Sequence, residues 1–184
     1  MDKLIRLQLS KFPEGNTNIA VIGSSSCQLL ELSDKKFWPK IVENGSESDE
    51  SIQNKPFIIF VTAHNNEWTM VLLDKYNSNL YFYYTSSDVN DKDLEFQNIY
   101  QEIAETCVGV HVVGVHVKRI SKDVYGQGEC GLVILWLLKK ILERGEPEAL
   151  FDGISSLEIS SIGFQCLKHI SLLPIVYSNR DIVD

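Results

Sequence analysis

The chain has 184 residues, 44% of them hydrophobic and 23% charged, which is ordinary for a globular protein with one sizeable core. The formal net charge of −8 argues against binding to duplex nucleic acid, because that ligand requires a basic protein face. No apolar run approaches the ~20 residues of a membrane-spanning helix, and the first residues lack the apolar core of a signal peptide. The composition leaves the oligomeric state open.

The cysteines are widely separated along the chain, and no pair of them has the spacing of a zinc site. They are Cys27, Cys107, Cys130 and Cys166. A chain of this length and apolar content does not need disulfides for stability. We therefore expect reduced thiols and a cytoplasmic protein.

The first third of the chain gives only weak structural signals. Residues 1–33 contain two apolar stretches, Leu4–Leu9 and Ile19–Ile22, which favour either short strands or a strand and a helix. The segment Glu43–Lys55 is polar, acidic and contains glycine and serine, and it is typical of an exposed loop.

Three apolar runs then predict a meander of antiparallel strands. The runs PFIIFVTAH (56–64) and EWTMVLLDKY (67–76) are separated only by Asn65 and Asn66. Because asparagine tolerates a positive φ, these two residues favour a tight hairpin turn. The third run, LYFYYT (80–85), follows after a short polar turn.

A helix and another strand are predicted next. Asp91 is placed to cap a helix whose apolar residues recur on one face: Phe96, Ile99, Tyr100, Ile103 and Cys107. The alternating segment 108–120 then predicts a strand, with a bulge or bend where the alternation shifts.

Residues 131–143 predict a helix that is apolar on all sides and therefore buried. The glycines at 126 and 128 separate it from the preceding strand. Residues 146–173 favour one or two further helices, and the last residues favour a loose tail.

Cys130 stands directly before this buried helix. A thiol at a helix N-terminus lies near unpaired backbone N–H groups, which favour the thiolate and can also hold a developing oxyanion. Cys130 is therefore a candidate nucleophile. The alternative is that it is a small, inert core residue, as most unpaired cysteines are.

A cysteine nucleophile needs a base, and the chain offers four histidines. His111 and His116 fall at odd and even positions of one predicted strand, so we expect them to face opposite sides as structural residues. His169 lies in the C-terminal helical part and favours a structural or exposed role. His64 ends a strand at a tight turn, which makes it the best candidate base.

The order of these elements resembles the Ulp and adenovirus-protease type of cysteine peptidase, known as clan CE. The resemblance covers roughly residues 56–145. Its most specific part is the run Glu129–Leu132, in which an acid, cysteine, glycine and apolar residue follow one another. Trp68 at the start of a strand matches the tryptophan that lines the family's substrate channel.

The resemblance implies an α+β fold related to papain, with a central mixed sheet flanked by helices and the nucleophile at the start of a buried helix. It also implies one domain over residues 1–184. In that domain, residues 1–55 are divergent, 56–145 form the core that resembles the catalytic one, and 146–184 form C-terminal helices and a tail.

Three catalytic positions of the family pattern are displaced or lost in this chain. The family places histidine directly before the tryptophan, where this chain has Glu67, and its acid near 84 or 85, whereas the nearest acid here is Asp88. Gln127 lies closer to the cysteine than the family's oxyanion glutamine.

A two-residue turn places His64 opposite Glu67 on one sheet face. The resulting hypothesis is a triad of Cys130, His64 and either Asp88 or Glu67.

The resemblance implies a cysteine protease that cleaves the C-terminal peptide or isopeptide bond of ubiquitin or a ubiquitin-like modifier. This chemistry needs no metal or organic cofactor. A catalytically inactive pseudoprotease that only binds its partner is the alternative, and an acetyltransferase of the YopJ type is a third, less favoured possibility. A secreted bacterial effector acting in host cytosol is compatible with the composition.

Overall fold

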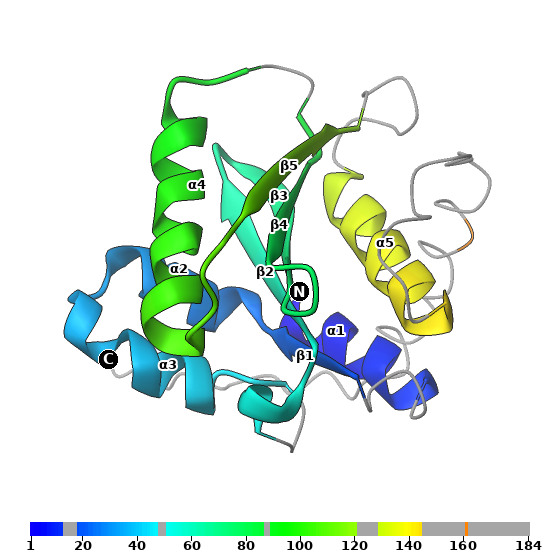
Figure 1. Cartoon of the computed structure of the whole chain (residues 1–184). Coiled ribbons are helices and arrows are strands. Elements are labelled where there is room, and N and C mark those ends of the chain that lie inside the picture. The colour runs from blue at the N-terminus through cyan, green and yellow to red at the C-terminus, as the bar shows by residue number, and fades with distance from the viewer. Residues whose placement is uncertain (13–17, 48–50, 87–88, 121–128, 145–160, 162–184) are drawn as a thin grey trace, which may run out of the picture.

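The computed structural model places five strands in one mixed sheet with helices on both faces (Figure 1). It describes residues 1–12, 18–47, 51–86, 89–120, 129–144 and 161. This arrangement of a mixed sheet and flanking helices confirms the predicted α+β class. No helix in the described part of the chain has the length and apolar character needed to cross a membrane.

The strands are β1 (Ile19–Ile22), β2 (Phe57–His64), β3 (Glu67–Asp74), β4 (Asn79–Tyr84) and β5 (Gly114–Arg119). The α-helices are α1 (Asp2–Lys11), α2 (Ser24–Leu32), α3 (Trp38–Asn44), α4 (Lys92–Ile103) and α5 (Cys130–Arg144). Short 3-10 helices cover Lys35–Phe37 and Ile52–Asn54, and a π-helical turn covers Ala104–Val108.

The strands lie in the order β1-β2-β3-β4-β5, with parallel pairs at both edges and antiparallel pairs in the middle. The predicted meander is confirmed as β2, β3 and β4. Asn65 and Asn66 form its first turn with φ angles of 52° and 63°, the left-handed conformation that asparagine accepts more readily than most residues.

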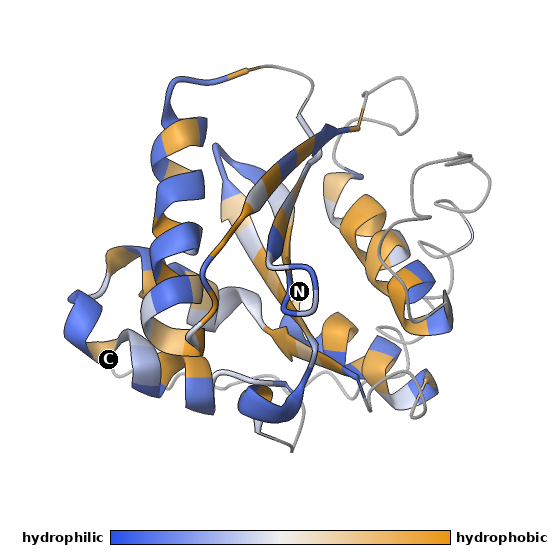
Figure 2. Ribbon diagram, viewed as in Figure 1, coloured by the Kyte–Doolittle hydropathy of each residue, from blue (hydrophilic) through white to orange (hydrophobic). Residues whose placement is uncertain are grey.

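Alternation along the strands divides the core into two layers. The first layer packs Ile59, Val61, Met70, Leu72, Tyr81 and Tyr83 against α1 and α5. The second packs Ile58, Phe60, Val71, Leu73, Phe82 and Tyr84 against α2, α3 and α4. Successive strand residues point to opposite faces, so a sheet covered on both sides needs apolar residues at both parities. Figure 2 shows the apolar surfaces of the helices turned toward the sheet.

Helix α5 confirms the predicted buried helix. Its residues Val133–Leu138, together with Ile141 and Leu142, are almost fully buried. This burial fixes the start of the helix against β3, and the start of the helix carries Cys130.

The predicted strand over 108–120 was too long, since only Gly114–Arg119 joins the sheet. The chain leaves α4 through a π-helical turn that ends at Gly109, whose φ is 75°. The backbone N–H of Val110 donates to the Ala104 carbonyl, which holds this turn away from the sheet. His111 therefore lies outside the strand, which corrects the prediction that it alternates with His116.

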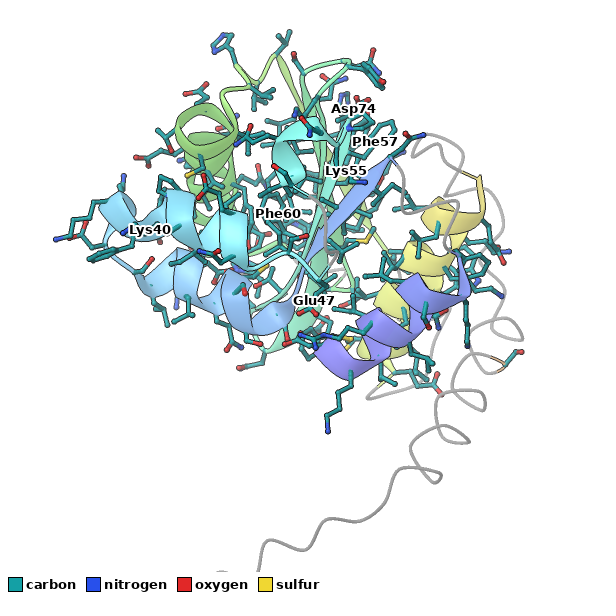
Figure 3. All side chains as sticks on the ribbon, turned by 90° about the horizontal axis from the view of Figure 1, so that it is seen from below. Lys40, Glu47, Lys55, Phe57, Phe60 and Asp74 are labelled. Carbon is teal, nitrogen blue, oxygen red and sulfur yellow. The ribbon has the colours of Figure 1, made fainter. Side chains whose placement is uncertain are left out.

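In the N-terminal part, the structure confirms the second of the two alternatives, a helix and a strand, since Ile19–Ile22 forms β1. Leu4–Leu9 belongs to α1, where Ile5 and Leu9 lie one helical turn apart and are buried against α5 and the sheet. The predicted loop at Glu43–Lys55 is partly structured, because α3 reaches Asn44 and Ile52 is buried. Figure 3 shows Phe60 in the core layer that α2 and α3 cover, and Lys40 on the outer side of α3. The C-terminal helices predicted over 146–173 lie outside the described residues, apart from position 161.

Candidate functional site

Cys130 and Trp68 come together at the start of α5. Cys130 is the first residue of the helix and is half-buried against the layer of core that α5 forms with the sheet. Trp68, on β3, packs against the same layer. A Cβ atom at Gly131 would lie 3.2 Å from Trp68 Cδ1 and 3.3 Å from Trp68 Nε1, so the absence of a side chain at this position allows the indole to approach the helix.

The Cys130 thiol differs in its surroundings from the other described cysteines. Burial raises the pKa of Cys27 far above its usual range, and burial also raises the pKa of Cys107. Cys130 is partly exposed, and its side chain makes no hydrogen bond within the described part of the chain. As the first residue of α5, it lies near the N–H groups of the first turn, which lack partners within the helix. Of these three thiols, Cys130 has the setting that best suits a nucleophile.

The His64 side chain is held by α4. Its Nε2 lies 2.8 Å from Asp93 Oδ1 and 2.9 Å from Asn65 Nδ2, and its ring stacks on Phe96 with 4.2 Å between the centroids. These contacts are on the side of the sheet that α2, α3 and α4 cover, whereas Cys130 packs in the opposite layer. No hydrogen bond joins the two side chains among the described residues.

Asp93 lies in the first turn of α4, and no sequence pattern identified it as a site residue. It accepts hydrogen bonds from His64, from the Asn90 backbone N–H at 3.1 Å and from the Arg119 guanidinium. Burial alone would raise the pKa of Asp93, but the hydrogen bonds from Arg119, Asn90 and His64 lower it below its usual value. Arg119 also lies 4.7 Å above the Tyr84 ring. Asp93 therefore ties β2, α4 and β5 together.

A polar hollow of about 200 Å³ surrounds this network. Its lining residues are His64, Asn65, Glu67, Thr69, Tyr84, Ser86, Asn90, Asp93 and Arg119. No sequence pattern indicated it, because its walls come from four separate segments that meet only in the folded chain.

Glu67 occupies the position directly before Trp68, where the resemblance places a histidine. It pairs with His64 across the hairpin, as the two-residue turn predicted. Its Oε2 lies 3.4 Å from Thr85 Oγ1, and that hydroxyl donates to the Trp68 carbonyl at 2.7 Å. The described contacts bring Asp93 rather than Glu67 to the His64 ring.

The other histidines in the described part of the chain do not add a base beside the thiol. His111 is exposed and its Nδ1 lies 3.2 Å from Glu105, while the His116 ring stacks on Tyr81 at 4.8 Å. His169, and the predicted site residues Asp88 and Gln127, lie outside the described residues. Within the described ranges, no group of three or more His, Cys, Asp or Glu side chains could hold a metal ion.

The sequence by itself finds no relatives: no protein-family profile matches it, and neither does any characterised protein. The fold does match solved structures. One is the SUMO protease Ulp1 with its catalytic cysteine oxidised to a sulfenic acid. It has a TM-score of 0.65 and 12% identity, over 92% of this chain and 78% of that chain.

Two other structures extend the comparison. The Ulp1 protease domain in complex with Smt3, the yeast orthologue of SUMO, has a TM-score of 0.61 and 16% identity, over 88% of this chain and 72% of that chain. The Chlamydia abortus effector ChlaDUB has a TM-score of 0.54 and 14% identity, over 96% of this chain and 93% of that chain.

These similarities, together with the mixed sheet, define the class of fold: it is that of the clan CE cysteine proteases. The predicted resemblance is therefore confirmed at the level of fold. At these identities the comparison carries the architecture over to this chain, while substrate and catalysis must be argued from its own side chains.

Proposed function

We propose that this chain binds the C-terminal tail of ubiquitin or of a ubiquitin-like modifier at the Trp68–Cys130 site without hydrolysing it. The protein thus corresponds to the pseudoprotease alternative of the sequence analysis. One of the similar structures, the Ulp1 domain with Smt3, is itself a complex with a modifier of this kind, which supports the choice of partner. The cytosol, where such modifiers occur, is the expected location.

The engagement of His64 is the observation that carries the proposal. A general base must lie within hydrogen-bond reach of the proton that it removes. In this chain the Nε2 atom of His64 is occupied by Asp93 and Asn65, and the ring is packed on Phe96. The position before Trp68, where the resemblance places the histidine, holds Glu67.

The packing of Trp68 supports a surface for the tail. Trp68 lies against Gly131, where no side chain separates the indole from the helix backbone. A tail that ends in glycines presents backbone groups and no bulk, so it suits a narrow passage between an aromatic ring and a helix start. The backbone N–H groups of Cys130 and Gly131 at the start of α5 can donate hydrogen bonds to its carbonyl oxygens, whereas those of Leu132 and Val133 already donate to the Glu129 carbonyl.

Hydrolysis is the second candidate, favoured by the partly exposed Cys130 at the first position of α5. In that reaction His64 takes the thiol proton, the thiolate adds to the carbonyl that ends the modifier, and the protonated amine leaves. Water then releases the modifier from the thioester. Asp88 or Glu67 would orient His64, and Gln127 would help to hold the oxyanion. This route requires His64 to leave Asp93.

A probe that carries an electrophile at the C-terminus of ubiquitin or SUMO separates the two candidates. We expect reversible binding, measured by calorimetry or by polarisation, and no covalent adduct at Cys130 in intact-mass spectra. A known clan CE protease serves as the positive control for the probe. An adduct that is lost in Cys130→Ala and in His64→Ala would instead establish the hydrolase.

The binding site is tested by Trp68→Ala, with Tyr76→Ala as the matched control. Both side chains are aromatic, but Tyr76 is 78% exposed and follows the far end of β3. Loss of binding in Trp68→Ala alone supports the proposal. Equal binding by both variants would show that the modifier docks elsewhere. A melting curve for each variant confirms that it folds.

A further inference from the structure

The residue at the start of α1, Met1, lies next to the same glycine of α5 as Trp68 does. A Cβ atom at Gly131 would lie 3.1 Å from Met1 Cε, as close as it would lie to the Trp68 indole. Met1, Trp68 and Cys130 pack against one layer of the core. Met1 and Trp68 thus both lie against the start of α5.

Two sets of contacts hold α1 in this position. Ile5 and Leu9 are buried against α5 and the sheet, which anchors the middle and the end of the helix. Figure 1 shows α1 lying across the molecule next to α5. The first turn has a separate, polar attachment through Asp2.

The Asp2 carboxylate binds the start of α2. Its Oδ1 accepts from the Ser24 backbone N–H at 2.8 Å and from the Ser24 hydroxyl at 2.6 Å, and its Oδ2 accepts from the Ser25 hydroxyl. Burial alone would raise the pKa of Asp2, but the hydrogen bonds from Ser24 and Ser25 lower it below its usual value. The carboxylate is therefore ionised at neutral pH and its attachment is intact there.

We infer that the first turn of α1 is a gate on the modifier-tail site: Met1 occupies the space beside Gly131 and Trp68, and Asp2 latches the turn to α2. This inference rests on the proposed function, since the tail would need the same space. The methionine side chain is unbranched and flexible, so it fills the space without strain and leaves it without disturbing the buried Ile5 and Leu9.

Release of the gate raises access to Cys130 and affinity for the tail together. In a two-state gate the apparent dissociation constant exceeds the intrinsic one by the inverse of the open fraction. If about a tenth of the molecules are open, removing the gate strengthens tail binding about tenfold.

Two variants test the gate, each compared with Lys3→Ser on the exposed side of the same turn. Met1→Ser removes the side chain, and cleavage of an N-terminal tag allows serine at position 1. Asp2→Asn keeps the shape of the latch but removes its charge. The readouts are the iodoacetamide alkylation rate of Cys130, measured by mass spectrometry of its peptide, and the affinity for ubiquitin and SUMO.

We expect Met1→Ser and Asp2→Asn to accelerate alkylation and to strengthen tail binding severalfold, with Lys3→Ser unchanged. Unchanged or slower alkylation in Met1→Ser, with an unchanged melting temperature, would overturn the gate and make Met1 a fixed wall. The alkylation readout needs no modifier. Faster alkylation without modifier binding would therefore support the gate while rejecting the proposed function.

Discussion

The two faces of the sheet differ in the side chains that the same strands present at their ends. The face that α5 covers is apolar up to its edge and ends at Cys130, Trp68 and Met1. The face that α4 covers ends in a charged network of His64, Asp93 and Arg119. The packing that exposes the Cys130 thiol at the start of α5 is therefore present. The candidate base, His64, instead binds Asp93, which joins β2 and β5 to α4.

The strand period explains how one hairpin supplies both faces. Trp68 and Glu67 are neighbours in sequence, so their side chains point to opposite sides of the sheet. The turn at Asn65 and Asn66 fixes the register that puts His64 opposite Glu67. A shift of this register by one residue would move the side chains of each face to the opposite face of the sheet.

The largest expected effect on stability comes from a substitution in the apolar layer that α5 covers. Leu135→Ala removes a side chain that is 1% exposed at the centre of α5, and we expect a loss of about 3 kcal/mol in unfolding free energy, as for other buried leucines. Urea unfolding measures it. Leu94→Ala, at a position on α4 that is 65% exposed, is the matched control and should change little. A loss below about 1 kcal/mol would mean that α5 is not a core helix.

The network of His64, Asp93 and Arg119 should contribute somewhat less to the free energy of unfolding than the Leu135 side chain does. Asp93→Ala removes the shared acceptor of His64 and Arg119, and we expect destabilisation of about 2 kcal/mol, measured by urea unfolding at pH 7. Asp91→Ala is the control, because Asp91 makes no side-chain cap hydrogen bond and is exposed. Alkylation of Cys130 should be unaffected, since the thiol lies on the other face.

The same network predicts a dependence on pH. The pKa of Asp93 is lowered in the folded protein, so its contribution to stability is present above the unfolded-state pKa and is lost as the pH falls through the folded-state pKa. The Asp93→Ala variant should show a shallower loss of stability in acid. Equal slopes for both proteins would mean that the network does not stabilise the fold.

A smaller effect is expected at the position where the resemblance places a histidine. Glu67→His puts histidine directly before Trp68, but a side chain at position 67 points to the face of the sheet opposite Trp68 and Cys130, so we expect the rate at which iodoacetamide alkylates Cys130 at pH 7 to change by less than about twofold. Glu67→Gln controls for loss of the carboxylate alone. A rate about tenfold higher in Glu67→His than in Glu67→Gln would show that position 67 does reach Cys130, because a nearby imidazolium favours the thiolate.

The smallest effect concerns Cys27, which should be unreactive in the native state. Burial raises its pKa, and its side chain has no exposed area, so only the unfolded protein should be alkylated there. Peptide mass spectrometry after alkylation in buffer and in urea makes the comparison. Native labelling of Cys27 at the rate of Cys130 would contradict the burial.

The elements with strong local signals could be predicted from the sequence. The meander followed from three apolar runs and from Asn65 and Asn66, whose positive φ angles suit the turn. Helix α5 followed from an uninterrupted apolar run that has no polar face to expose. The strand at 108–120 was overextended because the π-helical turn before Gly109 has no recognisable local pattern.

The contacts that define the site were beyond prediction for a different reason. Asp93 lies 29 residues from His64, and its sequence neighbours indicate only a helix start. Met1 and Gly131 come from opposite parts of the chain and meet because Ile5 and Leu9 pack α1 against α5. Such contacts depend on how whole elements pack, which no local window of sequence contains.

The sequence alone determined the hairpin and the cysteine at the start of a buried helix, because hydrophobic periodicity and turn chemistry act over a few residues. The α+β class was what the resemblance to the clan CE peptidases implied. Only the tertiary structure decided that His64 binds Asp93 and that α1 lies over Gly131. A side chain takes the partner that packing brings within about 3 Å, and packing is a property of the whole fold.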